Sequence, residues 1–334
     1  MELATAVALA MAIGLNLYVI LGGADFGGGV WDLFATGPRK EAQQALVAHA
    51  IGPVWEANHV WLILVVVLLF ACFPPAFAAY MIALHVPITL GLIGIVLRGS
   101  AFAFRAYGAI ESREQRRWGR VFAAASIFTP FMLGVCIGAV ASGRASVENG
   151  LPVNGFVGSW LGPFPLAVGG FTLAVFSLLA AVFLTLETDD PALREDFRRR
   201  ALAAAVAAGA AAAMALATAR LDAPPVWRDL TSGTRAALFH LVTGAFAVGA
   251  IAALLARRYH LARVLVPVQV SLILWGWLAN QYPYLVVPTL TIEEAAAPTR
   301  TLRLVLVALA AGAVVLFPSF AYLYATFEKF RGRT

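Results

Sequence analysis

The feature that most constrains this chain is a series of long apolar runs with almost no ionisable side chains. Leu62–Phe73, Met81–Val96 and Leu304–Phe317 are nearly free of such groups, and Ala201–Ala219 has none. A helix needs roughly 20 mainly apolar residues to cross the hydrocarbon layer of a membrane. A soluble core helix would carry a polar face, which these runs lack. The pattern therefore predicts a membrane-embedded protein.

Composition and charge support this interpretation. Of the 334 residues, 61% are hydrophobic and only 13% are charged, whereas about a quarter of the residues in a soluble domain are charged. The net charge of +6 does not indicate nucleic-acid binding, because the basic residues lie in alternate loops. Cys72 and Cys136 show no metal-ligand spacing, so both are interpreted as packing residues. The first apolar stretch lacks a basic leader and predicts a retained first span.

The predicted fold class is an all-α integral membrane protein with nine transmembrane helices. The spans are expected at 3–26, 57–72, 76–97, 120–141, 163–185, 201–219, 235–255, 262–280 and 304–326. The short link Phe73-Pro74-Pro75 predicts a tight hairpin between the second and third spans. No stretch is long enough for a separate soluble domain, so residues 1–334 form one membrane domain. It has a first helix bundle at 1–141, a second at 163–280 and a ninth helix at 304–326.

Basic residues predict the orientation of the chain. Most of the 24 Lys and Arg residues fall in the loops that share one side, and such loops face the cytoplasm. The amino terminus is then outside and the carboxyl terminus is cytoplasmic. Gly134 and Gly138 form a small-residue pair on the fourth span, which favours either packing inside the chain or a subunit interface.

Asp25 lies in the glycine-rich stretch Gly22–Gly29 at the end of the first predicted span. A carboxylate in the apolar layer costs on the order of 3 kcal/mol on insertion scales, so it needs a partner or a function. The surrounding glycines let neighbouring helices approach. Two interpretations stay open: a structural acceptor for backbone N–H groups or a loop arginine, or a protonatable functional group.

The second span opens with Gly52-Pro53-Val54-Trp55-Glu56-Ala57-Asn58-His59-Val60-Trp61. Glu56 falls in the first helical turn, where a carboxylate is stabilised by the helix dipole alone. His59 follows at i+3, which predicts an imidazole beside that carboxylate. Because Asp25 and Glu56 lie towards the same predicted side, we hypothesise a proton-conducting route that needs neither a metal nor a nucleophile. Trp55 and Trp61 fit such a site or an interfacial aromatic belt.

Several motifs resemble one known family. They are Gly23–Gly27, Gly52–Leu62, Leu69–Pro74, Leu97–Gly99 with Phe102, Phe104 and Arg105, and Tyr282-Pro283 with Pro288. The Trp-acid-x-Asn-x-x-Trp block that begins at Trp55 is the most specific of them. Together they resemble subunit II of the cytochrome bd quinol oxidases over most of the chain.

The resemblance implies two four-helix bundles and one peripheral helix. It implies a heterodimer with a heme-bearing subunit I that holds two hemes b and heme d, and it leaves a small third subunit open. Such a complex oxidises quinol, reduces O2 to water and generates a proton-motive force, using protons from the cytoplasm. Subunit II then has no cofactor, metal or catalytic residue of its own and binds no nucleic acid. The expected location is the cytoplasmic membrane of a bacterium or archaeon, in contact with lipid and quinone.

The resemblance also implies residue roles. The proton pathway is assigned to Glu56, Asp25, His59 and Asn58, an oxygen route or interface to Trp61 and Trp55, and a structural or interface role to Arg98 and Arg105. Two departures from the family pattern concern the proton pathway: Gly22 replaces a usual acid, and Glu56 replaces a usual aspartate.

Two other classes remain. A proton-coupled secondary transporter would also use carboxylates in glycine-rich helices, although no motif is repeated in the second half of the chain. A purely structural membrane partner is the third possibility. His85 is expected in mid-membrane as a hydrogen-bonded core residue and not as a heme ligand.

Overall fold

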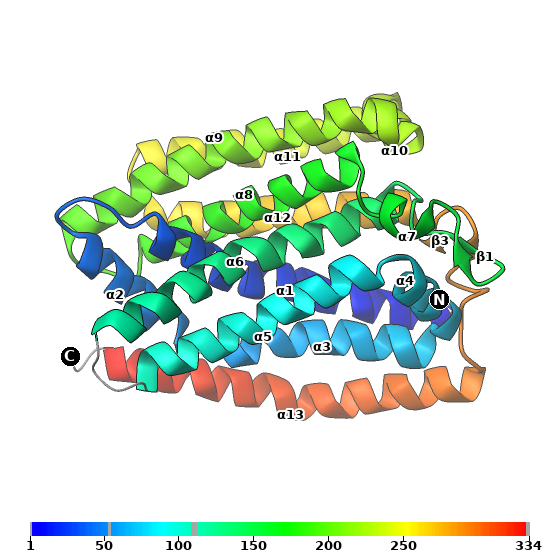
Figure 1. Cartoon of the computed structure of the whole chain (residues 1–334), viewed down its shortest axis with the longest axis horizontal. Coiled ribbons are helices and arrows are strands. Elements are labelled where there is room, and N and C mark those ends of the chain that lie inside the picture. The colour runs from blue at the N-terminus through cyan, green and yellow to red at the C-terminus, as the bar shows by residue number, and fades with distance from the viewer. Residues whose placement is uncertain (1, 53–54, 108–111, 332–334) are drawn as a thin grey trace.

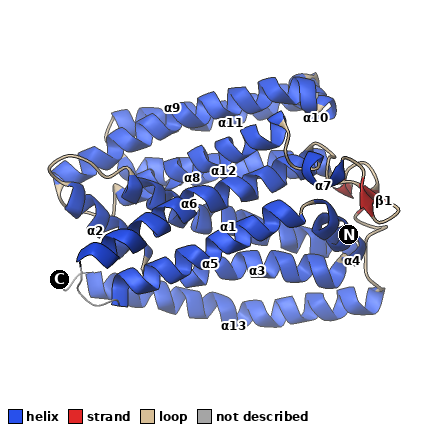
Figure 2. Cartoon of the chain, viewed as in Figure 1, coloured by secondary structure: helices blue, strands red, loops and turns tan. Residues whose placement is uncertain are grey.

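The structure, a computed structural model, describes residues 2–52, 55–107 and 112–331; the side chains at 55, 105–107, 112, 113, 115, 116 and 323–331 lie outside its described part. Helices make up most of the chain (Figure 2). They are α1 Leu3–Leu33, α2 Lys40–Ile51, α3 Trp55–Cys72, α4 Pro74–Ala83, α5 His85–Tyr107, α6 Ser112–Ala141, α7 Gly155–Gly158, α8 Pro163–Leu184, α9 Pro191–Asp222, α10 Pro224–Thr231, α11 Gly233–Leu255, α12 Tyr259–Gln281 and α13 Thr299–Arg331. Two antiparallel hairpins pair β1 (Val147–Glu148) with β2 (Leu151–Pro152) and β3 (Tyr284–Val286) with β4 (Leu290–Thr291).

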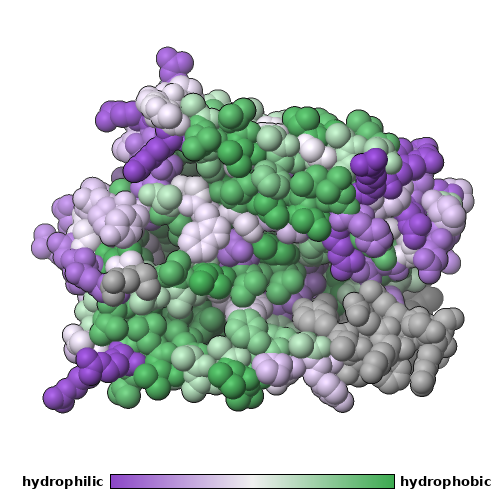
Figure 3. Space-filling view, turned by 180° about the vertical axis from the view of Figure 1, so that it is seen from behind, coloured by the Kyte–Doolittle hydropathy of each residue, from purple (hydrophilic) through white to green (hydrophobic). Residues whose placement is uncertain are grey.

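The helices have the length and composition of membrane spans. Within the described residues, eight helices are long and apolar enough to cross a membrane, and α2 with α3 forms a broken pair that would make nine. Figure 3 shows an apolar belt across the middle of the molecule, with hydrophilic residues gathered at the two ends. An apolar belt between two polar ends matches the layers of a bilayer. The predicted all-α, multi-pass membrane fold is therefore confirmed.

Several predicted span boundaries differ from the observed helices, and two of these differences matter for the site. The first span was expected to end at residue 26, but α1 continues to Leu33, so Asp25 and its glycines lie inside the helix. The third was expected to begin at residue 76, but the chain breaks between α4 and α5 at Leu84. Pro87 explains this break: its ring would clash with the Ala83 carbonyl in a continuous helix, and it has no N–H to donate to that carbonyl. Beside the break, His85 is exposed, so the prediction of a core histidine was wrong.

The packing is organised around α8. This helix contacts α1, α6 and α9, and α13 lies against α1 and α3 at one edge of the molecule (Figure 1). The largest core cluster includes Phe26, Phe176, Leu179 and Leu254, which come from α1, α8 and α11. The division into two bundles at 1–141 and 163–280 stays a prediction, because α1 and α6 both pack on α8 across that boundary.

Small residues allow the closest helix contacts. A Cβ atom on Gly134 would lie 2.5 Å from Thr172 Oγ1, and one on Gly138 would lie 2.6 Å from the Cα of Pro165. Both neighbours belong to α8, so this pair packs α6 on α8 within the chain. The alternative, a subunit interface at these glycines, was wrong.

Candidate functional site

A buried polar cluster lies where α1, α3, α5 and α6 meet. Asp25 of α1 is 5% exposed, and Asn58 of α3 is 3% exposed. The Asn58 Nδ2 donates to Asp25 Oδ2 at 2.6 Å. This bond satisfies one oxygen of the Asp25 carboxylate. The structure thus brings together two of the four residues that the sequence assigned to one pathway.

Arg98 of α5 supplies the opposite charge in this cluster. Its side chain is 2% exposed, and its Nη2 donates to the backbone carbonyl of Asp25 at 2.9 Å. The guanidinium carbon lies 4.8 Å from the ring centre of Phe26 and 5.1 Å from that of Phe122. A buried arginine is stable only when its donors and its charge are compensated. The Asp25 carboxylate and the two aromatic faces provide that compensation.

Ser126 of α6 completes the cluster, and the sequence analysis missed it. Its Oγ accepts from Arg98 Nε at 3.1 Å and donates to the Phe122 carbonyl at 2.7 Å. A Cβ atom on Gly29 would lie 2.1 Å from this Oγ. Gly29 therefore allows the hydroxyl of α6 to lie close to α1, where it accepts from Arg98. The glycine run around Asp25 predicted a close approach of another helix, but it did not identify Ser126 as the residue that approaches.

His59 and Glu56 point to different surroundings. The His59 ring packs edge-on against Tyr18 at 5.9 Å and Phe26 at 5.8 Å between ring centres. Glu56 is exposed at the start of α3. The ring of His59 thus faces α1, and its expected place beside the Glu56 carboxylate stays a prediction.

Glu56 heads an exposed stripe along α3. The stripe continues through Val60, Ile63, Val67 and Phe70, which are 40%, 61%, 51% and 62% exposed. These positions recur every three or four residues and so share one face of the helix. Glu56 is thus an acid at the end of an outward-facing apolar surface.

Trp61 lies on the inward face of the same helix. It is 7% exposed, and its ring stacks on Phe320 of α13 at 5.7 Å between ring centres. Trp61 therefore anchors α13 against α3. Trp55 and Arg105 lie on α3 and α5, and their side chains are outside the described part of the structure.

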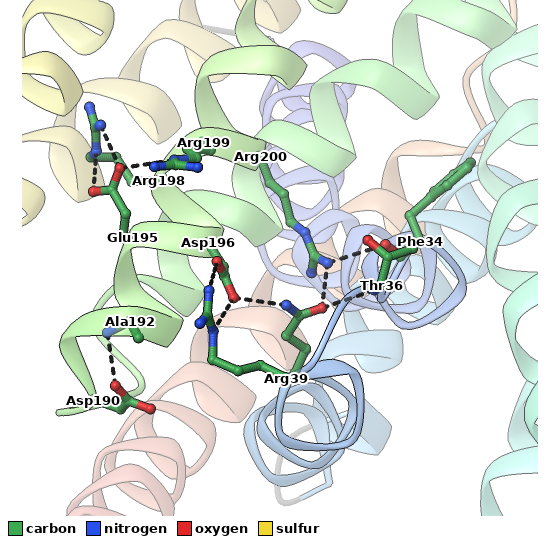
Figure 4. Close-up of polar contacts among 11 residues, drawn as sticks. Phe34, Thr36, Arg39, Asp190, Ala192, Glu195, Asp196, Arg198, Arg199 and Arg200 are labelled. Atoms are coloured by element: carbon green, nitrogen blue, oxygen red, sulfur yellow. Dashed lines mark hydrogen bonds and ion pairs between the residues drawn. The ribbon is translucent and has the colours of Figure 1, made fainter.

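A second polar network, which the sequence analysis also missed, ties α2 to α9 (Figure 4). Arg39 makes two bonds to Asp196, at 2.6 and 2.8 Å. Gln43 is 3% exposed; its Nε2 donates to Asp196 at 2.8 Å and its Oε1 accepts from Arg200 at 2.5 Å. This network fixes the segment that leads from α1 into α3.

The described residues contain no group of three His, Cys, Asp or Glu side chains that could hold a metal ion. A cavity of about 1020 Å³ lies between α1, α8, α9, α11 and α12, and Tyr18 lies on its wall. The candidate site is the group of Asp25, Asn58, Arg98 and Ser126, called the Asp25 cluster, which joins a carboxylate, an amide, a guanidinium and a hydroxyl in buried positions.

Comparison with known proteins identifies the family. The sequence model described as "Cytochrome bd terminal oxidase subunit II" matches residues 3–327. The chain belongs to this family. It is similar to "Cytochrome bd ubiquinol oxidase subunit 2" of Bacillus subtilis (strain 168), with 28% identity over 173 residues, 51% of this chain and 49% of the relative. It is also similar to "Cytochrome bd-I ubiquinol oxidase subunit 2" of Escherichia coli (strain K12), with 27% identity over 51% of this chain and 45% of the relative.

These two alignments cover about half the length of the relatives. A solved structure of the bd oxidase from Geobacillus thermodenitrificans contains a chain with the same fold. The TM-score is 0.81 and the identity 23%, over 98% of this chain and 99% of that chain. The fold of this bd subunit II family member is thus shared along its whole length.

Proposed function

We propose that this chain is the heme-free subunit II of a cytochrome bd-type terminal oxidase. With a heme-bearing subunit I, it would oxidise quinol and reduce O2 to water, and the proton-motive force would arise from cytoplasmic proton uptake. Membership of the subunit II family carries this proposal. The names of the relatives, which describe quinol oxidases, support it.

The proposal assigns two hemes b and heme d to subunit I. In this chain, the histidines described at membrane depth do not fit an axial heme ligand. His85 is exposed, and its Nδ1 lies 3.0 Å from the carbonyl of Ile82. His59 is enclosed by the rings of Tyr18 and Phe26. The proposal therefore gives this chain a role in proton transfer and in contact with the partner, and leaves heme binding to subunit I.

The exposed face of α3 is the proposed contact with subunit I. Helix α5 also carries exposed apolar side chains, at Leu92, Ile93 and Val96, which are 58%, 49% and 58% exposed. A partner that covers this face would bury Glu56 at the interface. Lipid chains cannot satisfy a carboxylate, whereas a partner subunit can supply polar groups and water. This difference favours a protein partner at the Glu56 end of the stripe.

The proton route would begin at Glu56 and pass along the first turns of α3 to Asp25. Asn58 and His59 follow Glu56 on the first turn of α3, and Asn58 bonds to Asp25. Arg98, which donates to the Asp25 carbonyl, would hold this part of α1 in place. Trp61 would line an apolar path for oxygen between α3 and α13.

The test uses Glu56→Gln in the assembled complex, purified through this chain. We expect slower O2 reduction with unchanged heme content, because a glutamine cannot release a proton. Glu114→Gln on α6 changes another exposed acid and should leave the rate unchanged. A complex without a heme d band in its reduced-minus-oxidised spectrum would refute the oxidase proposal. Loss of hemes with normal proton kinetics in Glu56→Gln would instead show a structural role for Glu56.

A further inference from the structure

A basic cleft lies outside the Asp25 cluster, where the N-terminal part of α9 meets the turn between α11 and α12. Its volume is about 580 Å³. It is lined by Leu186, Arg194, Arg257, Arg258, Tyr259, His260 and Leu261. The ends of these helices lie at the same end of the bundle as the loop between α1 and α2 (Figure 1). Three guanidinium groups thus border one cleft at the edge of the apolar belt.

Arg257 occupies a backbone position that normally belongs to glycine. Its N–H bonds to the Leu254 carbonyl at 3.2 Å, and the Arg258 N–H bonds to the Ala253 carbonyl at 2.8 Å. This pairing ends α11 in a Schellman motif, whose left-handed residue is usually glycine. Here the left-handed residue is Arg257, with φ of 58°. A side chain that is retained at a conformational cost indicates a function for that side chain.

The chain contains its own comparison at the end of α6. There the Arg144 N–H bonds to the Ala139 carbonyl and the Gly143 N–H to the Val140 carbonyl, both at 3.1 Å. Gly143 fills the left-handed position, with φ of 76°. The same helix ending is therefore built with glycine elsewhere in this protein, so the turn itself does not require an arginine at position 257.

The arginines at the cleft are only weakly neutralised. Arg257 lies 3.8 Å from Glu195, whose carboxylate already accepts from Arg198 at 2.7 and 2.8 Å. In the described part of the chain, Arg258 makes no ion pair. A guanidinium that is not held by a carboxylate has donors to offer to an anion.

Arg194 forms the fixed wall of the cleft. It donates to the Thr185 carbonyl at 3.1 Å and to the Thr188 carbonyl at 2.5 Å. Its guanidinium carbon lies 5.8 Å from the ring centre of Tyr259. The nearby Asp189 carboxylate, at 3.5 Å, is fully exposed to solvent and screens this charge only weakly.

An apolar surface adjoins the cleft and distinguishes a lipid from a free ion. Leu255, Leu261 and Val264 are 61%, 44% and 60% exposed on the flanking helices, and Leu261 also lines the cleft. A free phosphate ion gains nothing from exposed leucine and valine side chains. A phospholipid can place its phosphate among the arginines and its acyl chains along these residues.

We propose that this cleft binds the phosphate group of an anionic phospholipid from the adjacent membrane leaflet. Arg257 and Arg258 donate to the phosphate oxygens, Arg194 adds positive charge behind them, and the acyl chains lie on Leu261 and Val264. The site holds lipid at the end of the second predicted bundle. It does not depend on the oxidase activity.

The test measures phosphatidylglycerol that stays bound to the purified complex, by native mass spectrometry after exchange into detergent with added phosphatidylglycerol or phosphatidylcholine. Arg257→Gly keeps the backbone of the turn and removes the guanidinium; Arg258→Gln removes the second. We expect each variant to bind phosphatidylglycerol about fivefold more weakly, with phosphatidylcholine unaffected. Arg257→Gly should also leave the thermal midpoint in lipid-free detergent equal to that of the native complex or higher.

Arg117→Gln serves as the matched control, because Arg117 is an exposed arginine on α6 that does not line the cleft. Equal loss of phosphatidylglycerol in this control would overturn the proposal in favour of a general attraction between basic surface and acidic lipid. Unchanged binding in both cleft variants would also overturn it. Displacement of the lipid by millimolar inorganic phosphate would show an ion site and not a lipid site.

Discussion

Replacing Arg98 by methionine gives the sharpest test of the buried cluster. The change keeps much of the apolar stem but removes the donors to the Asp25 carbonyl and to Ser126 Oγ. Hydrogen bonds that involve a charged group each contribute about 1.5–3 kcal/mol. Removing one member of a buried charged pair costs about 3–5 kcal/mol, because the other charge is left uncompensated. The Asp25 carboxylate would be that charge.

We therefore expect Arg98→Met to lower the stability of the complex by about 3–5 kcal/mol. At about 2 °C per kcal/mol, the thermal midpoint should fall by roughly 6–10 °C, measured by tryptophan fluorescence in a fixed detergent. Arg220→Met removes an exposed arginine of α9 and should shift the midpoint by about 1 °C or less.

A double-mutant cycle tests the physical cause of this loss. Asp25→Asn removes the negative charge and keeps an oxygen that can accept from Asn58. If the two charges compensate each other, Asp25→Asn with Arg98→Met should lose about 1–3 kcal/mol less than the sum of the single changes. Losses that add within about 0.5 kcal/mol would refute the reasoning. Arg98 would then be held by its hydrogen bonds and aromatic contacts alone.

Three further predictions concern other parts of the chain. Gly29→Ala should lower the free energy of unfolding by about 1–3 kcal/mol, and with it the thermal midpoint, because the new Cβ would lie 2.1 Å from the Ser126 hydroxyl. Gly209→Ala, which has open space around it, should not lower the midpoint. Gln43→Ala should cost about 1–3 kcal/mol and speed hydrogen exchange across residues 34–51, and unchanged exchange would contradict the role of the α2–α9 network. The Glu2 carboxyl raises the pKa of Glu293 above its usual range. The folded protein therefore favours the protonated form of Glu293. The stability that this protonation gives the fold is lost as pH rises through the raised pKa of Glu293. Glu293→Gln should therefore raise the midpoint slightly at pH 7 and not near pH 4, and an equal shift at both values would exclude this carboxyl pair as its cause.

The sequence predicted the membrane fold because its signal is local. Runs such as Ala201–Ala219 reveal their environment without knowledge of any neighbour. It also selected Asp25, Asn58 and Arg98, since polar groups within apolar runs need partners wherever they lie. The chain breaks at Phe73, where the double proline predicted a turn, and it breaks again at Leu84, which Pro87 could have predicted.

The partners within the site were not readable in the same way. Ser126 lies 28 residues from Arg98, and Gln43 lies 153 residues from Asp196. Contacts over such separations depend on how each helix is rotated about its axis. A short polar residue such as Ser126 is equally compatible with lipid, core or site until that rotation is known. The packing of the His59 ring against Tyr18 and Phe26 of α1 could not be predicted for the same reason.

The two-residue step between Glu56 and Asn58 on α3 places one outwards and the other inwards. Two residues in one helical turn are therefore constrained by different neighbours during evolution. Asn58 can change only together with Asp25 and its neighbours in the same polypeptide, encoded by one gene. If Glu56 meets subunit I, its compensating substitutions arise in a second gene. Related oxidases should therefore show Glu56 covarying with positions in the partner chain, while Asn58, Asp25 and Arg98 covary among themselves.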